Sequence, residues 1–148
     1  MTRTMVDQDV DKLDSFLRGE MSAVETYDQA LEKLGDDPTY GTALRAARES
    51  HQARVERLRD ELLKRGAMPS DGSGVWGGFA RLVEGGAKVF GAKAAIAALE
   101  EGEDHGRDEY RQELEELSAG ARAFVEHQLL PEQLRTHDAI SALKHSLP

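Results

Sequence analysis

Cysteine is absent from this chain of 148 residues. Without a thiol the chain can form neither a disulfide framework nor a thiolate metal site, which excludes zinc fingers and iron–sulfur clusters. Positive charge is also scarce, because 19 Lys and Arg residues stand against 28 Asp and Glu residues and give a formal net charge of −9. An acidic surface repels phosphate groups, so we expect neither nucleic acid nor an anionic membrane as a partner.

Long hydrophobic runs are missing as well. No stretch approaches the roughly 18 uninterrupted apolar residues that a membrane-spanning helix needs. The opening sequence, MTRTMVDQDVDKLDSF, contains no apolar core of a signal peptide. We therefore expect a soluble cytoplasmic protein, and the length favours one domain over residues 1–148.

What the chain does contain is a helical pattern. Only four prolines interrupt a sequence rich in Ala, Leu, Glu, Arg and Lys, and apolar residues recur with a period of roughly 3.5. This pattern predicts an all-α protein with no strands. The predicted helices cover about residues 6–34, 38–65, 87–117 and 121–146.

Short turns separate the helices of each predicted pair. The sequence therefore predicts two helical hairpins, about residues 6–65 and 87–146, joined by a long glycine-rich crossover at 66–86. We expect Gly35 to end the first helix in a left-handed cap. Pro131 is expected to kink or loosen the last helix, because proline lacks the backbone N–H that an α-helix needs.

An internal repeat relates the two hairpins. Sliding the chain by 83 residues gives seven identities in the 22 positions from residue 13 to residue 34, where common amino-acid frequencies predict roughly one or two. The identical pairs include Glu20 with Glu103 and Tyr27 with Tyr110. We expect the members of each pair to occupy equivalent places in a four-helix bundle.

Carboxylates and imidazoles fall on the predicted apolar faces. Glu20 and Glu103 lie in the middle of their stripes, where an unpaired carboxylate costs several kcal/mol or becomes neutral. Glu100 lies one turn before Glu103, and the second and fourth helices contribute His51 and His137. Oxygen and nitrogen ligands inside a bundle suit iron, manganese or zinc. We therefore predict a metal site formed by these five residues.

A second interpretation needs no metal. Glu20 and Glu103 would then accept hydrogen bonds from Tyr27, Tyr110, Arg107 or the two histidines, and the chain would be a structural or stress-associated interaction domain. The charged run RESHQARVERLRDELLKR, which includes His51, is expected to form a solvated helical face. Both interpretations stay open at the level of the sequence.

Several motifs carry a family resemblance. The spacing from Glu20 to Tyr27 resembles the first-helix motif of ferritin-like proteins, and EEGE at residues 100–103, followed by Tyr110, resembles the third-helix motif of rubrerythrin relatives. More narrowly, LEEGEDHGRDEYRQEL, HDAISAL and GSGVWGGF are similar to a family of bacterial ferritin-like four-helix-bundle domains of unknown function. The resemblance covers roughly residues 10–146. It implies a ferritin-like four-helix bundle with a role in metal handling or oxidative stress.

The chain departs from that pattern at one kind of motif. Functional di-iron members carry Glu-x-x-His on the second and fourth helices. Here Arg48 stands three residues before His51, and Leu134 stands three residues before His137. Because both motifs are incomplete, we do not expect ferroxidase or peroxidase chemistry, and a single metal held by two glutamates and a histidine stays open.

The crossover holds the only tryptophan of the chain. Its large apolar residues are spaced like those of a short amphipathic helix: Trp76, Phe79, Val83 and, just beyond, Phe90. Such a segment forms either a lid over one side of the bundle or a surface for a second subunit. We expect a homo-oligomer, most simply a dimer.

Overall fold

The computed structural model describes residues 4–73 and 91–147. Within these ranges every regular element is a helix, which confirms the all-α prediction. The long helices are α1 (Met5–Leu34), α2 (Pro38–Lys64), α4 (Ala92–Glu113) and α6 (Leu130–Ser146), and a short α5 (Ala119–Phe124) precedes α6.

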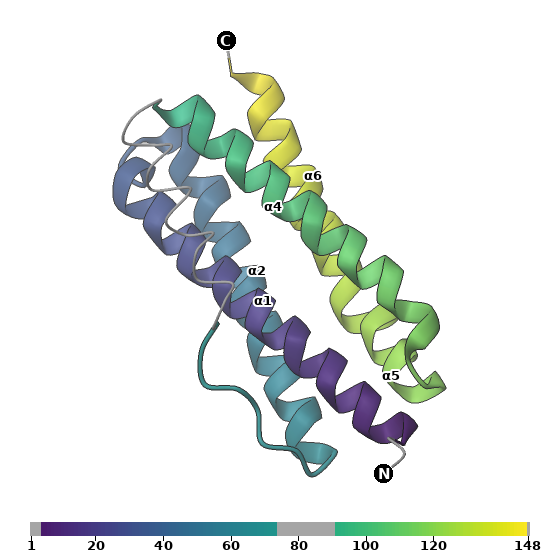
Figure 1. Cartoon of the computed structure of the whole chain (residues 1–148). Helices are drawn as coiled ribbons and strands as arrows, with labels where there is room; N and C mark the ends of the chain where they lie inside the picture. The colour runs from purple at the N-terminus through teal and green to yellow at the C-terminus, as the bar shows by residue number, and fades with distance from the viewer. Residues whose placement is uncertain (1–3, 74–90, 148) are drawn as a thin grey trace.

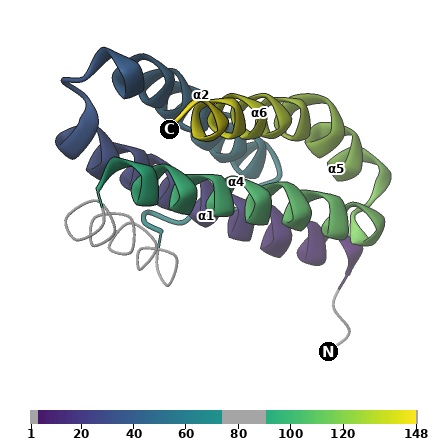
Figure 2. The same cartoon turned by 90° about the horizontal axis from the view of Figure 1, so that it is seen from above.

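The four long helices pack as two hairpins laid against each other. α1 packs on α2 and α4 packs on α6 (Figure 1). Seen from above, α1 lies beside α4 in one row, and α2 lies beside α6 in the other (Figure 2). The end of α2 and the beginning of α4 lie at opposite ends of the bundle (Figure 1).

Capping side chains and a proline fix the N-termini of the two helices in the first hairpin. Thr4 and Asp7 form a reciprocal capping box at the start of α1. Asp37 accepts a hydrogen bond from the backbone N–H of Thr39 at 2.9 Å, and Pro38 opens α2 with a backbone angle already suited to a helix. Because α1 ends at Leu34 and Asp37 already caps α2, the turn between them is short and the two helices run antiparallel.

Gly35 does not adopt the left-handed cap that we expected. Its φ and ψ are −65° and −25°, which is right-handed, and its N–H continues the helical pattern by donating to the Leu31 carbonyl at 2.8 Å. The next helix begins so soon that the chain turns without a left-handed residue. Here the glycine is needed for space, because a Cβ would lie 2.5 Å from the Leu31 oxygen.

The second hairpin is more irregular than the sequence suggests. α4 ends at Glu113 and continues as a 3₁₀ turn, Leu114–Glu116. After α5, residues Val125–Leu129 form a π-helical turn directly before α6. Pro131 stands in the first turn of α6, so the local loosening expected near this proline is confirmed, with the wider turn placed just before it.

Apolar residues fill the bundle in two clusters. One contains Leu13, Leu17, Leu58 and Leu62, and the other contains Leu44, Ile96, Leu99 and Ile140. Along α2, α4 and α6 the buried residues between the two clusters are polar, whereas Glu20 of α1 lies between Leu17 and Val24 of the first cluster. The centre of the bundle is therefore a polar layer enclosed by apolar ones.

The first part of the crossover runs along α1. The backbone N–H of Ser70 donates to Asp14 at 2.8 Å, and the hydroxyl of Ser73 donates to Glu25 at 3.0 Å. Trp76, Phe79, Val83 and Phe90, for which we predicted a lid or a subunit contact, lie outside the described residues. No helix in the described ranges combines the length and apolar character that crossing a membrane requires.

Candidate functional site

Glu20 and Glu103 lie opposite each other in the polar layer, with only 5% and 3% of their surfaces exposed. The ring of His51 lies between them. Its Nδ1 is 2.5 Å from Glu20 Oε2, and its Nε2 is 2.7 Å from Glu103 Oε2. Because a carboxylate only accepts hydrogen bonds, both ring nitrogens donate when both glutamates are ionised. The geometry therefore describes an imidazolium that bridges two carboxylates.

Arg54 follows His51 by three residues on α2, which places it on the same face of the helix. Its side chain is completely buried. Nη1 donates to Glu20 Oε1 at 3.2 Å and to the side-chain oxygen of Gln133, while Nη2 donates to the Thr136 hydroxyl at 3.1 Å. The guanidinium thus brings a second positive charge to the two glutamates.

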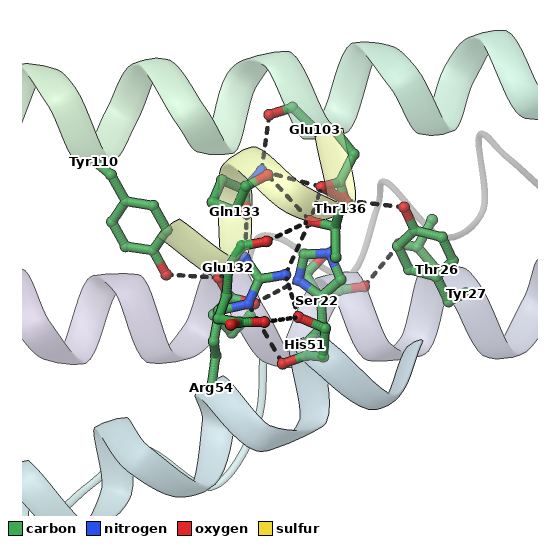
Figure 3. Close-up of polar contacts among 12 residues, drawn as sticks. Ser22, Thr26, Tyr27, His51, Arg54, Glu103, Tyr110, Glu132, Gln133 and Thr136 are labelled. Carbon is green, nitrogen blue, oxygen red and sulfur yellow. Dashed lines mark hydrogen bonds and ion pairs between the residues drawn. The ribbon is translucent and has the colours of Figure 1, made fainter. Parts of the chain in front are cut away.

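Two tyrosines complete the layer by a reciprocal exchange. Tyr27 of α1 donates its hydroxyl hydrogen to Glu103 of α4 at 2.9 Å, and Tyr110 of α4 donates to Glu20 of α1 at 2.6 Å. Figure 3 shows the two rings entering the cluster from opposite sides. The residues that the 83-residue repeat matches are therefore equivalent in the structure, and each tyrosine serves the glutamate of the other hairpin.

The last helix contributes neutral groups. Gln133 donates from Nε2 to the backbone oxygen of Glu103 at 2.8 Å and to its Oε1 at 3.2 Å, and Thr136 donates to the same Oε1 at 2.5 Å. Gln133 and Thr136 are three residues apart on α6, like His51 and Arg54 on α2 (Figure 3). Two pairs with helical spacing thus face each other across the two glutamates.

The charges of this cluster balance. Burial alone would raise the pKa of both glutamates, but the positive charges of Arg54 and His51 outweigh it. The pKa of Glu20 falls below its usual value, and that of Glu103 falls to about 2. Burial lowers the pKa of His51, yet Glu103 and Glu20 raise it overall. The two carboxylates therefore face one guanidinium and, below the raised pKa of His51, one imidazolium.

The structure brings together three of the five residues predicted to bind metal: Glu20, His51 and Glu103. Glu100 lies outside the cluster, where its carboxylate accepts a hydrogen bond from Lys144 at 2.8 Å, and this contact lowers its pKa. Glu100 precedes Glu103 by three residues, which is slightly less than one helical turn, so the two side chains point in directions about 60° apart. That rotation turns Glu100 away from the centre and toward α6.

His137 also lies outside the cluster. Its Nε2 is 2.5 Å from Asp104 Oδ1, and Arg107 lies 3.2 Å from the same nitrogen. Thr136 occupies the inward position, and the next residue is rotated by about 100°. Arg107, which the metal-free interpretation counted among the donors to the glutamates, pairs here with His137 and Asp108 instead.

We tested whether the donor set fits a divalent metal. All four carboxylate oxygens of the two glutamates already accept hydrogen bonds from Arg54, His51, Tyr27, Tyr110, Gln133 or Thr136. Metal ligation would also require a ring nitrogen without its proton. Within residues 4–73 and 91–147 no group of three or more His, Cys, Asp or Glu side chains is arranged to hold a metal ion. The residues as placed do not fit one, and metal binding stays a prediction.

Sequence reasoning missed Arg54, Gln133 and Thr136. Arg54 belongs to the charged run that we expected to be solvated, and the expectation is wrong for this residue because its guanidinium finds anionic partners inside the bundle. One signal was present. Arg54 lies three residues after His51 and four before Leu58, so it falls on the helix face between two buried residues.

A model of a family described as a domain of unknown function (DUF2383) matches residues 8–116. The matched range includes Glu20, His51, Arg54 and Glu103 but ends before Gln133. No curated protein and no solved structure matches the chain.

Proposed function

This chain belongs to that family of domains of unknown function, and we propose that it is a metal-independent, ferritin-like four-helix-bundle domain with a structural or interaction role. In this proposal Arg54 and His51 supply between Glu20 and Glu103 the positive charge that metal ions supply in di-iron bundles. The single observation that carries it is the saturation of both carboxylates by donors of the chain itself.

The layout of the cluster supports the ferritin-like part. Di-metal bundles of this kind use one glutamate from each of two helices and a pair with i, i+3 spacing from each of the other two. Here α1 and α4 contribute the glutamates, whereas α2 and α6 contribute His51 with Arg54 and Gln133 with Thr136. The helices and the spacing are those of such a site, but one pair carries two cations, His51 and Arg54, and the other carries two neutral donors, where glutamate and histidine would bind metal.

The contacts of the cluster support a structural role. Every interaction of Glu103 with Tyr27 or His51 joins the second hairpin to the first, and every interaction of Glu20 with Tyr110 does the same. Buried ion pairs are weak sources of net stability but can select one arrangement among several. A hairpin that slipped by one turn would leave buried charges unpaired. We infer that the cluster fixes the register of the two hairpins.

Metal analysis tests this proposal. Protein purified without chelator should contain far less than one iron, manganese or zinc per chain, and its melting temperature should be the same with added metal and with chelator. Near-stoichiometric metal that raises the melting temperature, and that is lost in the Glu20→Ala, Glu103→Ala double variant, would contradict it. That result would favour the competing proposal of a metal-handling protein, for which the convergence of Glu20, His51 and Glu103 is the supporting observation.

Self-association is part of the interaction role. We propose that the chain forms a homodimer, on the basis of its apolar crossover segment and its small size. Sedimentation equilibrium of the full chain tests this. A mass that stays at the monomer value of 16.3 kDa at high protein concentration would contradict it.

A further inference from the structure

A cavity of about 520 Å³ lies beside the charged cluster, between α1 and α4. Its inner wall includes Glu20, His51 and Glu103, and Glu109 lies at its edge on α4. Much of the rest is lined by small or apolar residues: Phe16, Gly19, Ala23, Ala98, Leu99, Gly102 and Gly106. Because these residues fill little of the space between the two helices, a ligand-sized volume remains. Pockets for small molecules commonly fall between about 300 and 1,000 Å³.

The walls suit an apolar body with an aromatic contact. Phe16 and Tyr110 meet edge to face with ring centroids 4.8 Å apart, and both line the cavity. Leu99 and the alanines extend the apolar surface. The charged inner wall offers a ligand few free hydrogen-bond acceptors, since the carboxylates there already accept hydrogen bonds from other residues of the same chain. The polar selectivity of this cavity must therefore come from its edge.

Glu109 supplies that selectivity. Glu109 lines both this cavity and a smaller hollow of about 180 Å³. Its side chain is 26% exposed, and its ion pair with His105 Nε2 spans 3.7 Å. Within the described ranges no hydrogen bond reaches its carboxylate. Burial raises the pKa of Glu109, which indicates an anion that is poorly solvated where it stands.

The negative charge around the cavity also favours a cationic ligand over an anionic one. Glu101 and Glu109 both line the cavity, and the whole chain carries a net charge of −9. An anionic ligand would be repelled on approach and would meet a carboxylate at the edge. A cationic ligand would be attracted, and its charge would pair with a half-buried carboxylate that has spare acceptor capacity.

We propose that the cavity between α1 and α4 binds a small molecule that has an apolar body and a positively charged amino group. The apolar body packs between Phe16, Tyr110 and Leu99. The ammonium group pairs with Glu109 at the edge. This site lies against the saturated cluster, which forms its inner wall, and needs no change in the hydrogen bonds of the cluster.

Gly19 makes the cavity testable without damage to the fold. A Cβ built on Gly19 meets no atom of residues 4–73 and 91–147 within 4 Å, although Gly19 lies in the middle of α1 and lines the cavity. Gly19→Leu should therefore fill the cavity with a side chain that also favours the helix. Gly120→Leu is the matched control, because Gly120 is exposed on α5 and a Cβ there meets, among the described residues, only the end of Arg65 at 3.8 Å.

Three probes of equal length separate charge from apolar contact. Octylammonium, octanol and octanoate are titrated into the full chain below their micelle concentrations, and binding is followed by calorimetry and by ligand-observed NMR. Wild-type protein should bind octylammonium at least about tenfold more tightly than octanoate, with octanol between them. Glu109→Gln should remove this preference and leave octanol binding unchanged.

The variants decide the location. Gly19→Leu should lose binding of all three probes, while Gly120→Leu should bind them like wild type, and circular dichroism with thermal melting establishes that both variants are folded. The proposal is overturned if wild type binds none of the probes. It is equally overturned if octanoate binds as well as octylammonium, or if folded Gly19→Leu binds them unchanged.

Discussion

The hydroxyl of Tyr27 lies 2.9 Å from Glu103 Oε2, so a residue of the first hairpin stabilises a buried charge of the second by a hydrogen bond. Tyr110 and Glu20 repeat the same contact in the opposite direction at 2.6 Å. Both tyrosines are almost completely buried, and burial followed by the charge of the nearby glutamate raises the pKa of each well above its usual value. Both are therefore donors at any physiological pH.

Tyr27→Phe and Tyr110→Phe should each lower the free energy of unfolding by about 1.5–3 kcal/mol, because each leaves one bond to a buried carboxylate unmade. Urea denaturation measures the loss. Tyr40→Phe is the control, since Tyr40 is only partly buried and its hydroxyl has no hydrogen bond among the described residues. Equal losses in all three variants would contradict a special role for the exchange.

Arg54→Met should destabilise the bundle by roughly 3–5 kcal/mol, because the methionine fills similar space but leaves two carboxylates facing one imidazolium. Any folded fraction should then gain stability from added divalent metal, which wild type should not. Melting curves with zinc, manganese and chelator measure both effects.

Arg57→Met serves as the comparison for that experiment. Arg57 lies one turn further along α2, is exposed and donates to the Gln128 carbonyl at 3.0 Å. Its loss should cost less than about 1 kcal/mol and should create no response to metal. A metal response in wild type as strong as that in Arg54→Met would show that the guanidinium does not occupy the place of a cation.

Stability should depend on pH on both sides of a maximum. Glu103 has its pKa lowered from 4.5 to about 2, so its contribution is complete above about 4.5 and is lost as the pH falls toward 2. His51 has its pKa raised above 6.5, so its contribution is complete below about 6.5 and is lost as the pH rises through the higher value. Maximal stability is expected between about pH 4.5 and 6.5.

Urea denaturation across this range, kept below the ionisation of tyrosine, measures the profile. Glu103→Gln should flatten the acid side, and His51→Gln should flatten the alkaline side. A profile that keeps both slopes in the two variants would mean that other groups produce them.

Two cavity-lining glycines should respond to alanine with opposite signs. Gly19→Ala should stabilise the chain by up to about 1 kcal/mol, because a Cβ there meets no described residue within 4 Å and alanine favours the helix. Gly106→Ala should destabilise it, because a Cβ there lies 2.9 Å from Nε2 of Gln133, which is 2% exposed and held by hydrogen bonds to Glu103. Thermal melting of the two variants checks the signs, and stabilisation by both would contradict the packing described at Gly106.

The sequence predicted the helices and the polar centre for a simple reason. Leu13, Leu17, Val24 and Tyr27 recur at helical spacing around Glu20, and burial of the apolar residues carries the glutamate inward with them. The repeat transferred the same argument to Glu103. Periodicity along one helix is a local property, so the amino-acid pattern alone is enough to place both glutamates in the core.

The same reasoning did not predict correctly which neighbouring polar residues face the centre of the bundle. Glu100 and His137 stand one turn or one residue from inward-facing positions, and a rotation of about 60° or 100° separates them from the centre. Which of them faces inward depends on where the next helix lies. The π turn before α6 shifts that register further, and the sequence signals it only through Pro131.

The sequence by itself determined that this chain folds into helices and that two symmetric glutamates are buried, because hydrophobic periodicity and the internal repeat are written along single helices. Only the tertiary structure decided what compensates those charges. Arg54, His51, Gln133 and Thr136 come from two helices that pack against the glutamates from the other side, and their atoms meet across distances that no spacing along the chain encodes. Charge compensation is a property of the packed bundle, since a buried carboxylate takes whichever donors the neighbouring helices bring within reach.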